Sequence, residues 1–107
     1  MNVKSLVFYN KQAWDKAGYK APESLDDLAA LGEQIKSDGG TPWCFGIESG
    51  TATGWPVTDW FEDLIMRYGG AETYNQWVTN EVKFDSDVVK QAADYMEQTV
   101  LADDSVP

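Results

Sequence analysis

The stretch TGWPVTDWFEDLIMRYGG, from Thr53 to Gly70, carries the clearest helical pattern of the chain. Pro56 suits the first turn of a helix, and the glycine pair at residues 69–70 marks its end. Between them, apolar residues recur every three or four positions, as they do on the buried face of a helix. This apolar stripe consists of Val57, Trp60, Phe61, Leu64, Ile65 and Tyr68. The stretch therefore predicts an amphipathic helix that packs into a core, with Trp60 turned inward.

Two apolar runs of strand length precede this helix, at residues 3–9 and 41–47. Their β-branched and aromatic residues are typical of strands. Cys44 lies inside the second run and is expected to be a buried core residue. Two strands make a poor sheet on their own, because several helical faces would then lack a partner. We therefore expect residues 1–107 to form a single partial domain of a longer protein.

Helices are expected next to these runs. Asn10 suits the cap of a short helix through Ala17, and Ser24 suits the cap of a longer helix that ends near Asp38. Residues 71–80, after the glycine pair, suggest another short helix. The combination of strands and helices predicts an α/β class, with helices packed on a small sheet.

A last helix is predicted near the end of the chain, with Asp85 or Ser86 as its cap. Apolar residues gather on one side of it, which indicates that this helix also faces the core. They are Val88, Val89, Ala92, Ala93, Met96 and Val100.

The charge balance of the chain is strongly acidic. The formal net charge is −10, and Lys36 is the only basic residue between Pro22 and Met66. Such a surface repels a phosphate backbone and an anionic membrane surface, so nucleic-acid binding is disfavoured. A neutral or mildly cationic partner fits the charge better.

Several kinds of chemistry lack their residues in this chain. Cys44 is the only cysteine and there is no histidine, so an internal disulfide, a histidine-containing zinc site and a histidine-based triad are not expected. No run approaches the roughly 20 apolar residues of a membrane-spanning helix, so this segment is not expected to insert into a membrane. We expect neither a metal nor a cofactor.

A polar loop from Glu48 to Gly54 follows the second predicted strand. Ligands of open α/β sheets gather at the carboxyl ends of the strands, so this loop is the best-placed segment for binding. Ser49 and Thr53 supply hydroxyl groups, while Gly54 lets a ligand approach the backbone. Glu48, Ser49, Thr53 and Gly54 are therefore candidates for a ligand-binding site.

Trp55 and Asp59 lie one helical turn apart at the start of the predicted helix. Sugars stack their C–H faces on aromatic rings, and their hydroxyl groups bind carboxylates, so this pair fits a carbohydrate site. Two alternatives stay open: Trp55 as a core residue, and Asp59 as a solvated acid that favours the helix dipole. Lys4 is a further candidate ligand, with a merely solvated lysine as its alternative.

Two other functions are considered on the same residues. Four acidic residues, namely Glu48, Asp59, Glu62 and Asp63, could provide the paired carboxylates of a glycoside-acting enzyme, with Asp59 and a nearby acid as catalysts. The acidic helices could instead form a docking face of a protein-interaction module. A solvated acidic helix face explains the same residues without either function.

Three stretches together resemble a known family. They are VKSLVFYNKQAWDKAGY (residues 3–19), APESLDDLAALGEQIKSDGGTPWCFGIESG (residues 21–50) and TGWPVTDWFEDLIMRYGG (residues 53–70). The chain is similar in them to the carbohydrate solute-binding proteins of bacterial ABC importers, of the α-glucoside and oligosaccharide type, and more distantly to maltose-binding protein. The order and spacing of YNK, of the loop proline and of the Trp-Pro pair carry the resemblance.

This resemblance implies a periplasmic-binding-protein-like (type II) fold, whose two α/β lobes close on a sugar. The chain would cover part of the second lobe, beginning near a hinge strand. It would act outside the cytoplasm, as a periplasmic protein or a cell-surface lipoprotein, and deliver an oligosaccharide to an ABC permease without catalysis. Trp55 aligns with the family's Trp-Pro pair, whereas Ala52 replaces an aromatic residue of maltose-binding protein, which puts maltodextrin specificity in doubt.

Overall fold

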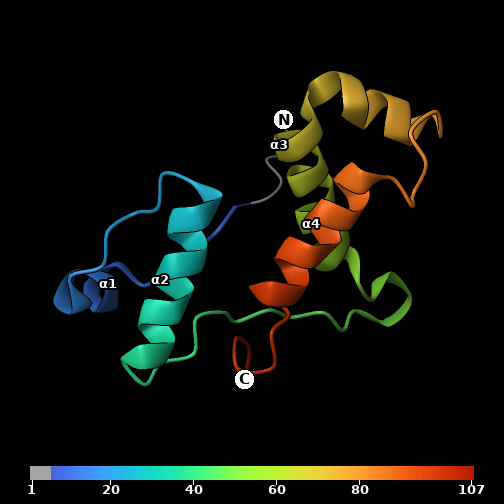
Figure 1. Cartoon of the computed structure of the whole chain (residues 1–107). Helices are drawn as coiled ribbons and strands as arrows, with labels where there is room; N and C mark the ends of the chain where they lie inside the picture. Colours follow the sequence, from blue (N-terminus) through green and yellow to red (C-terminus); the bar gives the residue numbers. More distant parts are fainter. Residues whose placement is uncertain (1–5) are drawn as a thin grey trace.

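The computed structural model describes residues 6–107, and this part of the chain is helical. Figure 1 shows α1 and α2 on one side and α3 and α4 on the other, with the segment that follows α2 running beneath them. The elements are α1 (Lys11–Ala17), α2 (Leu25–Ser37), the 3₁₀ turn η1 (Gly50–Ala52), α3 (Trp55–Val78) and α4 (Asp87–Gln98).

The first two helices begin where the sequence places their caps. The Asn10 side chain accepts a hydrogen bond from the Ala13 N–H at 3.1 Å, and Ser24 Oγ accepts one from the Asp27 N–H at 3.0 Å. These bonds satisfy backbone donors that a helix start leaves without a partner. Gly18, at φ 74°, ends α1. The predictions for both helices are confirmed.

The third helix is longer than predicted, and it bends at the glycine pair. Gly70 has φ 76° and ψ 173°, which are not helical values, so the two predicted helices meet there at a sharp turn. A Cβ on Gly69 would lie 2.7 Å from Thr73 and 3.1 Å from Val88. Gly70 therefore permits the bend, and Gly69 permits the close packing around it. The bend is seen at the top of Figure 1.

The core lies between α3 and α4. It consists of the buried residues Leu64, Ile65, Val89, Ala92, Met96 and Val100. Trp60 and Phe61 are partly buried against it, as predicted from the stripe on α3. The stripe on α4 is confirmed apart from Ala93, which is exposed because it lies on the solvent side of that helix.

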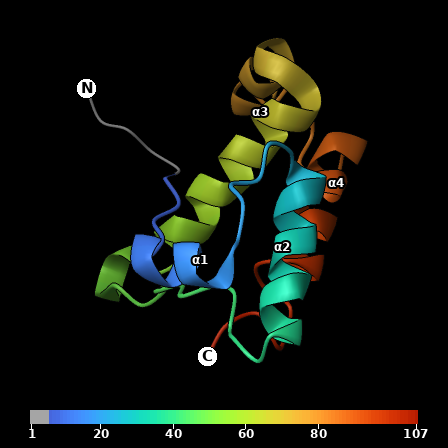
Figure 2. The same ribbon diagram turned by 90° about the vertical axis from the view of Figure 1, so that its left-hand side faces the viewer.

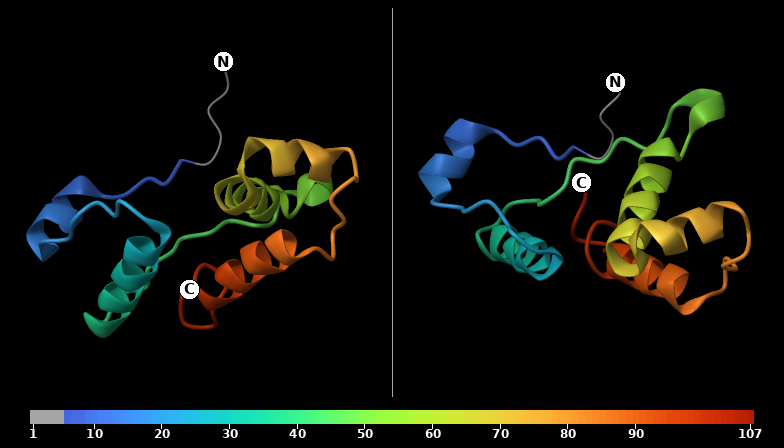
Figure 3. Two further views of the ribbon diagram at one scale, coloured as in Figure 1. Left: turned by 45° about the horizontal axis from the view of Figure 1, so that its top comes forward. Right: turned by 90° about the horizontal axis from the view of Figure 1, so that it is seen from above.

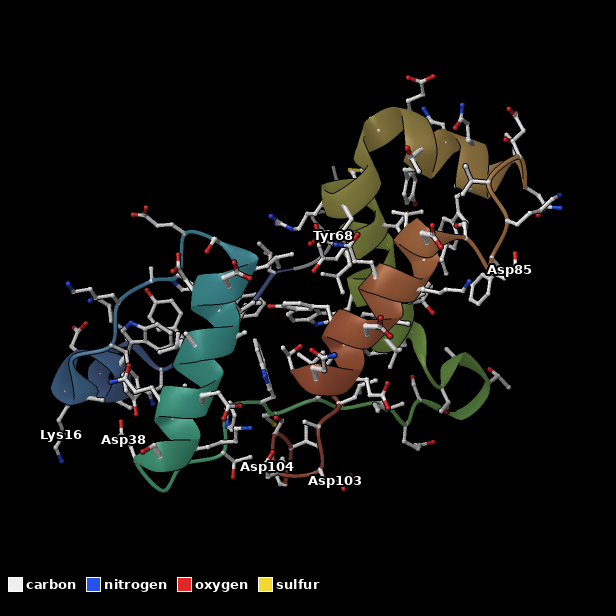
Figure 4. All side chains as sticks on the ribbon, viewed as in Figure 1. Lys16, Asp38, Tyr68, Asp85, Asp103 and Asp104 are labelled. Carbon is white, nitrogen blue, oxygen red and sulfur yellow. The ribbon has the colours of Figure 1, made fainter. Side chains whose placement is uncertain are left out.

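α2 contributes one buried apolar residue, Leu31, and polar contacts tie it to the rest. Near its start, the Tyr95 hydroxyl of α4 donates to the Leu25 carbonyl at 2.9 Å. Near its end, Lys36 Nζ lies 3.1 Å from an Asp104 carboxylate oxygen. Figure 4 shows Asp104 in the C-terminal segment beside this end of α2, and Figure 2 shows α2 in front of α4.

The Tyr95 hydroxyl sits in a partly apolar environment between α2 and α4. Burial, with smaller contributions from the neighbouring Tyr68 and Asp26, raises the pKa of Tyr95 to about 12. Burial also raises the pKa of Tyr68, which lies on α3 between the other two helices (Figure 4). Both phenols therefore stay protonated well above neutral pH.

The fold is open for its length. The radius of gyration is 15.2 Å, whereas a compact domain of this size has about 13 Å. Seen from above, α1 and α2 stand apart from α3 and α4, and residues 40–49 cross between the two pairs (Figure 3).

The predicted strands are absent from the described residues. Residues 41–47 follow an irregular path, as do residues 6–9, while residues 3–5 of the first predicted strand lie outside the described part. A strand needs a neighbour for its backbone hydrogen bonds, and residues 6–107 supply none. The sheet is therefore not confirmed, and Cys44, predicted to be buried in it, is exposed.

Candidate functional site

The loop predicted to bind a ligand is held together by its own hydrogen bonds. Thr53 Oγ1 donates to the Gly50 carbonyl at 2.7 Å and accepts from the Ser49 N–H at 3.1 Å. A Glu48 carboxylate oxygen accepts from the Gly50 N–H at 2.8 Å. Gly54, at φ 97°, then leads into α3. Glu48 and Thr53 thus shape the loop, and this fixes the place where α3 begins.

Trp55 stands at the first position of α3 and is 56% exposed. Its interpretation as a core residue at the helix entrance is therefore wrong. Asp59 is half-buried one turn further along the same helix, so both side chains project from neighbouring positions of one helical face. The arrangement places an accessible ring and a half-buried carboxylate one turn apart on α3. Lys4 lies outside the described residues.

A hollow of about 180 Å³ lies between the start of α2 and the middle of α3, and neither Trp55 nor Asp59 lines it. From α3 it is lined by Trp60, Asp63 and Arg67. Arg67 Nε donates to an Asp63 carboxylate oxygen at 2.6 Å, which places an ion pair at the wall. The Trp60 ring meets Trp43 edge to face, with centroids 5.4 Å apart. The hollow therefore combines aromatic, apolar and charged groups.

One wall of this hollow has a signal in the sequence, because Trp60, Asp63 and Arg67 recur at helical spacing on one face of α3. The sequence could not reveal the opposite wall, which comes from Leu6 and Val7, residues 22–25 and Leu28. Of the four acids considered for hydrolysis, Asp63 lines the hollow and is already ion-paired. Glu48 belongs to the loop described above and does not line it.

The described residues show neither a metal centre nor a membrane helix. Within residues 6–107, acidic and cysteine side chains form no cluster of three or more that could bind a metal ion. No helix in the same range combines the length and the apolar character needed to cross a membrane.

Comparison with known proteins identifies the family. Residues 1–106 match the family described as bacterial extracellular solute-binding protein. The chain belongs to this family. The resemblance seen in the three sequence stretches is thereby confirmed, and membership in the family of solute-binding proteins implies a periplasmic-binding-protein-like fold.

Three relatives of this solute-binding protein illustrate the match. The "Alpha-glucosides-binding periplasmic protein AglE" of Rhizobium meliloti is 52% identical over 84 residues, or 78% of this chain and 18% of the relative. The "Osmoprotective compounds-binding protein GgtB" of Synechocystis is 44% identical over 93 residues, which cover 87% of this chain and 22% of the relative. The "Multiple sugar-binding protein" of Streptococcus mutans is 30% identical over 105 residues, which cover 94% of this chain and 24% of the relative.

The chain spans about a fifth of the length of these relatives. No solved structure matches it.

Proposed function

We propose that this chain is part of the carbohydrate-binding component of an ABC sugar importer. The protein would work outside the cytoplasm, as a periplasmic or surface-anchored protein, where it would capture an oligosaccharide and deliver it to the permease. The observation that carries this proposal is the family match over residues 1–106, together with relatives named for binding α-glucosides and multiple sugars.

Residues 1–107 would form part of one lobe of the two-lobe fold. Exposed apolar side chains support this proposal, because Leu6, Val7, Phe8 and Tyr9 are 53–87% exposed. A folded protein rarely leaves such a run in water, and strand pairing would cover it while satisfying its backbone groups. Residues 3–9 and 41–47 would thus belong to a small sheet on which the helices pack.

The sugar would meet this lobe at the start of α3. Trp55 would stack on a face of the sugar ring, and the Asp59 carboxylate would accept hydrogen bonds from its hydroxyl groups. Gly54 and Ser49 would offer backbone and hydroxyl contacts, and Lys4 would approach from the first strand. The exposure of Trp55 supports this role, since a stacking ring must be accessible.

Capture by two lobes predicts that one lobe alone binds weakly. A dissociation constant of 1 μM corresponds to about −8 kcal/mol, so an equal share for each lobe leaves about −4 kcal/mol, or millimolar affinity. The test therefore uses the full-length protein. Its family consists of binding proteins rather than enzymes, so binding without turnover is expected.

The test measures thermal stabilisation of the full-length protein by maltose and sucrose, which are α-glucosides, and by cellobiose, a β-linked control. We expect the α-glucosides to raise the melting temperature and Trp55→Ala to remove most of this rise. Loss of one stacked ring corresponds to about a tenfold loss of affinity. The matched control is Met66→Ala, since Met66 is also an exposed apolar residue of α3, 46% exposed.

Two results would contradict the proposal. If no sugar stabilises the protein, carbohydrate capture is wrong. If Trp55→Ala leaves the sugar response unchanged, sugar binding stands but Trp55 is not part of the site. Release of nitrophenol from aryl glycosides, abolished by Asp59→Asn, would support the hydrolytic alternative instead.

A further inference from the structure

The loop that leads into α3 is closed at its base and anchored to the rest of the chain. We call residues 47–54 the entry loop. The Gly54 N–H donates to the Ile47 carbonyl at 3.0 Å, which joins the two ends of the loop. The segment before it is held at Trp43, whose N–H donates to the Ser105 carbonyl at 2.9 Å and whose ring packs against the core. In Figure 1 the entry loop lies at the lower right, where this segment turns into α3.

One side chain, that of Thr53, spans the entry loop. Its Oγ1 atom accepts from the Ser49 N–H and donates to the Gly50 carbonyl, at the distances given above, and Glu48 accepts from the Gly50 N–H. A hydroxyl group has one proton to donate and two lone pairs. The Thr53 hydroxyl therefore cannot donate to a ligand without giving up a bond that closes the loop.

The end of the entry loop sets the direction of the Trp55 ring. Gly54 has φ 97° and ψ −10°, a conformation that residues with a side chain rarely adopt. Trp55 follows directly, as the first residue of α3. Its ring is 56% exposed, so its direction depends largely on the backbone from which it projects.

We infer that Thr53 is a positioning residue for sugar binding. Its hydroxyl holds the entry loop in the conformation in which Gly54 presents the Trp55 ring to a sugar. The inference rests on the proposed function, in which Trp55 is the stacking residue. A ring that is in place before the ligand arrives loses less conformational freedom on binding, which strengthens binding.

Without the Thr53 hydroxyl, the entry loop would populate other conformations. The apparent dissociation constant rises in inverse proportion to the fraction of molecules that are competent to bind. Thr53 would thus affect sugar affinity through Trp55, although its own hydroxyl is engaged within the loop. A direct sugar contact by Thr53 and a purely structural role are the two alternatives.

The experiment measures the affinity of the full-length protein for maltose and sucrose by titration calorimetry. Thr53→Val keeps the shape of the side chain and removes the hydroxyl, and we expect it to raise the dissociation constant about fivefold. Thr53→Ser keeps the hydroxyl and is expected to bind within about twofold of the unmodified protein. Thr51→Val makes the same change in the same loop, at a hydroxyl outside the bonds described above, and is the matched control.

A double-variant cycle with Trp55→Ala separates positioning from direct contact. If Thr53 acts through Trp55, Thr53→Val has no further effect on affinity in the Trp55→Ala protein. The same additional loss in that background would show that Thr53 contacts the sugar itself, and would overturn the inference.

The state of the Trp55 ring is also measurable without a sugar. Fluorine NMR of protein labelled with fluorotryptophan resolves the indole rings, and the signal that disappears in Trp55→Ala belongs to Trp55. We expect this signal to shift or broaden in Thr53→Val and to stay unchanged in Thr53→Ser. An unchanged signal in Thr53→Val would overturn the inference.

Three further results would overturn the inference. The first is an affinity of Thr53→Val within about twofold of the unmodified protein, because the hydroxyl would then have only a structural role. The second is an equal loss of affinity in Thr51→Val. The third is a lack of any sugar response in the unmodified protein, which would remove the proposed function as well, whereas the other results leave sugar capture intact.

Discussion

The pair formed by α3 and α4 and the neighbouring α2 are held in different ways. Between α3 and α4, six apolar residues are almost completely removed from water. α2 buries one apolar residue, Leu31, at 9% exposure. Its links to the rest are the partial packing of Leu25 against that core, the Tyr95–Leu25 hydrogen bond and the Lys36–Asp104 ion pair.

These two kinds of contact differ in strength. Complete burial of a large apolar side chain contributes about 1.5–3 kcal/mol, whereas a hydrogen bond contributes about 1 kcal/mol and an exposed ion pair less. The α3–α4 pair is therefore the stable part of the chain, and α2 is expected to separate from it first. Local opening of this kind is measurable by hydrogen exchange.

Leu64→Ala is expected to have the largest effect, because Leu64 is completely buried between α3 and α4. Truncation leaves a cavity in the core, so the free energy of unfolding should fall by about 3 kcal/mol. Chemical denaturation measures this change. Met66→Ala, two positions along the same helix and 46% exposed, is the matched control. Equal losses for the two variants would mean that the core is not where the structure places it.

Alkaline pH is expected to weaken mainly the attachment of α2, because the Tyr95 hydroxyl that contacts α2 ionises. The folded pKa of Tyr95 is about 12, against 10.0 for an ordinary tyrosine, so the unfolded chain ionises first. The stabilising contribution is complete below pH 10 and is lost as the pH rises towards 12, by roughly 1–2 kcal/mol after allowance for solvent screening. Denaturation curves across this range measure the loss.

The Tyr95→Phe variant supplies the control for this titration. Lys36 also has a raised pKa, because it donates hydrogen bonds to Glu33 and Asp104. It loses its charge as the pH rises, so some decline in stability should remain in the variant. An alkaline decline identical to that of the unmodified protein would rule out Tyr95 as its main source.

Tyr95→Phe at neutral pH is expected to have the smallest effect. It removes the hydrogen bond to the Leu25 carbonyl and keeps the ring, so the free energy of unfolding should fall by about 1 kcal/mol. Hydrogen exchange should become faster in α2 and stay unchanged in the α3–α4 core. Tyr9→Phe is the control, because the Tyr9 side chain is 53% exposed. Faster exchange in the core instead of α2 would contradict the division between the two regions.

The helices could be predicted because their signals are local. Asn10 and Ser24 act on residues within one turn, and each caps its helix in the structure as the sequence indicated. The position of the break at Gly70 was also predictable, since glycine tolerates the required φ angle. Strands depend on partners elsewhere in the chain, so the apolar runs were insufficient to establish them. The prediction that Cys44 is buried was wrong for the same reason.

The candidate site was predictable to a smaller extent. The exposure of Trp55 agrees with a stacking role, but its part in sugar binding stays a prediction. The hollow beside Trp60 depends on contacts between segments that are distant in sequence, and so does the ring contact between Phe61 and Phe84. Spacing along one helix shows which residues share a face, whereas it does not show what that face meets.

Gly69 and Gly70 divide α3 into two helical segments that meet at an angle. The first segment starts at Trp55, and the second ends at Val78. The angle between them depends on Gly70, which adopts φ 76°, and on Gly69, where an added methyl group would strike Thr73. The direction of the Trp55 end of α3 relative to its Val78 end is therefore set by two residues without side chains.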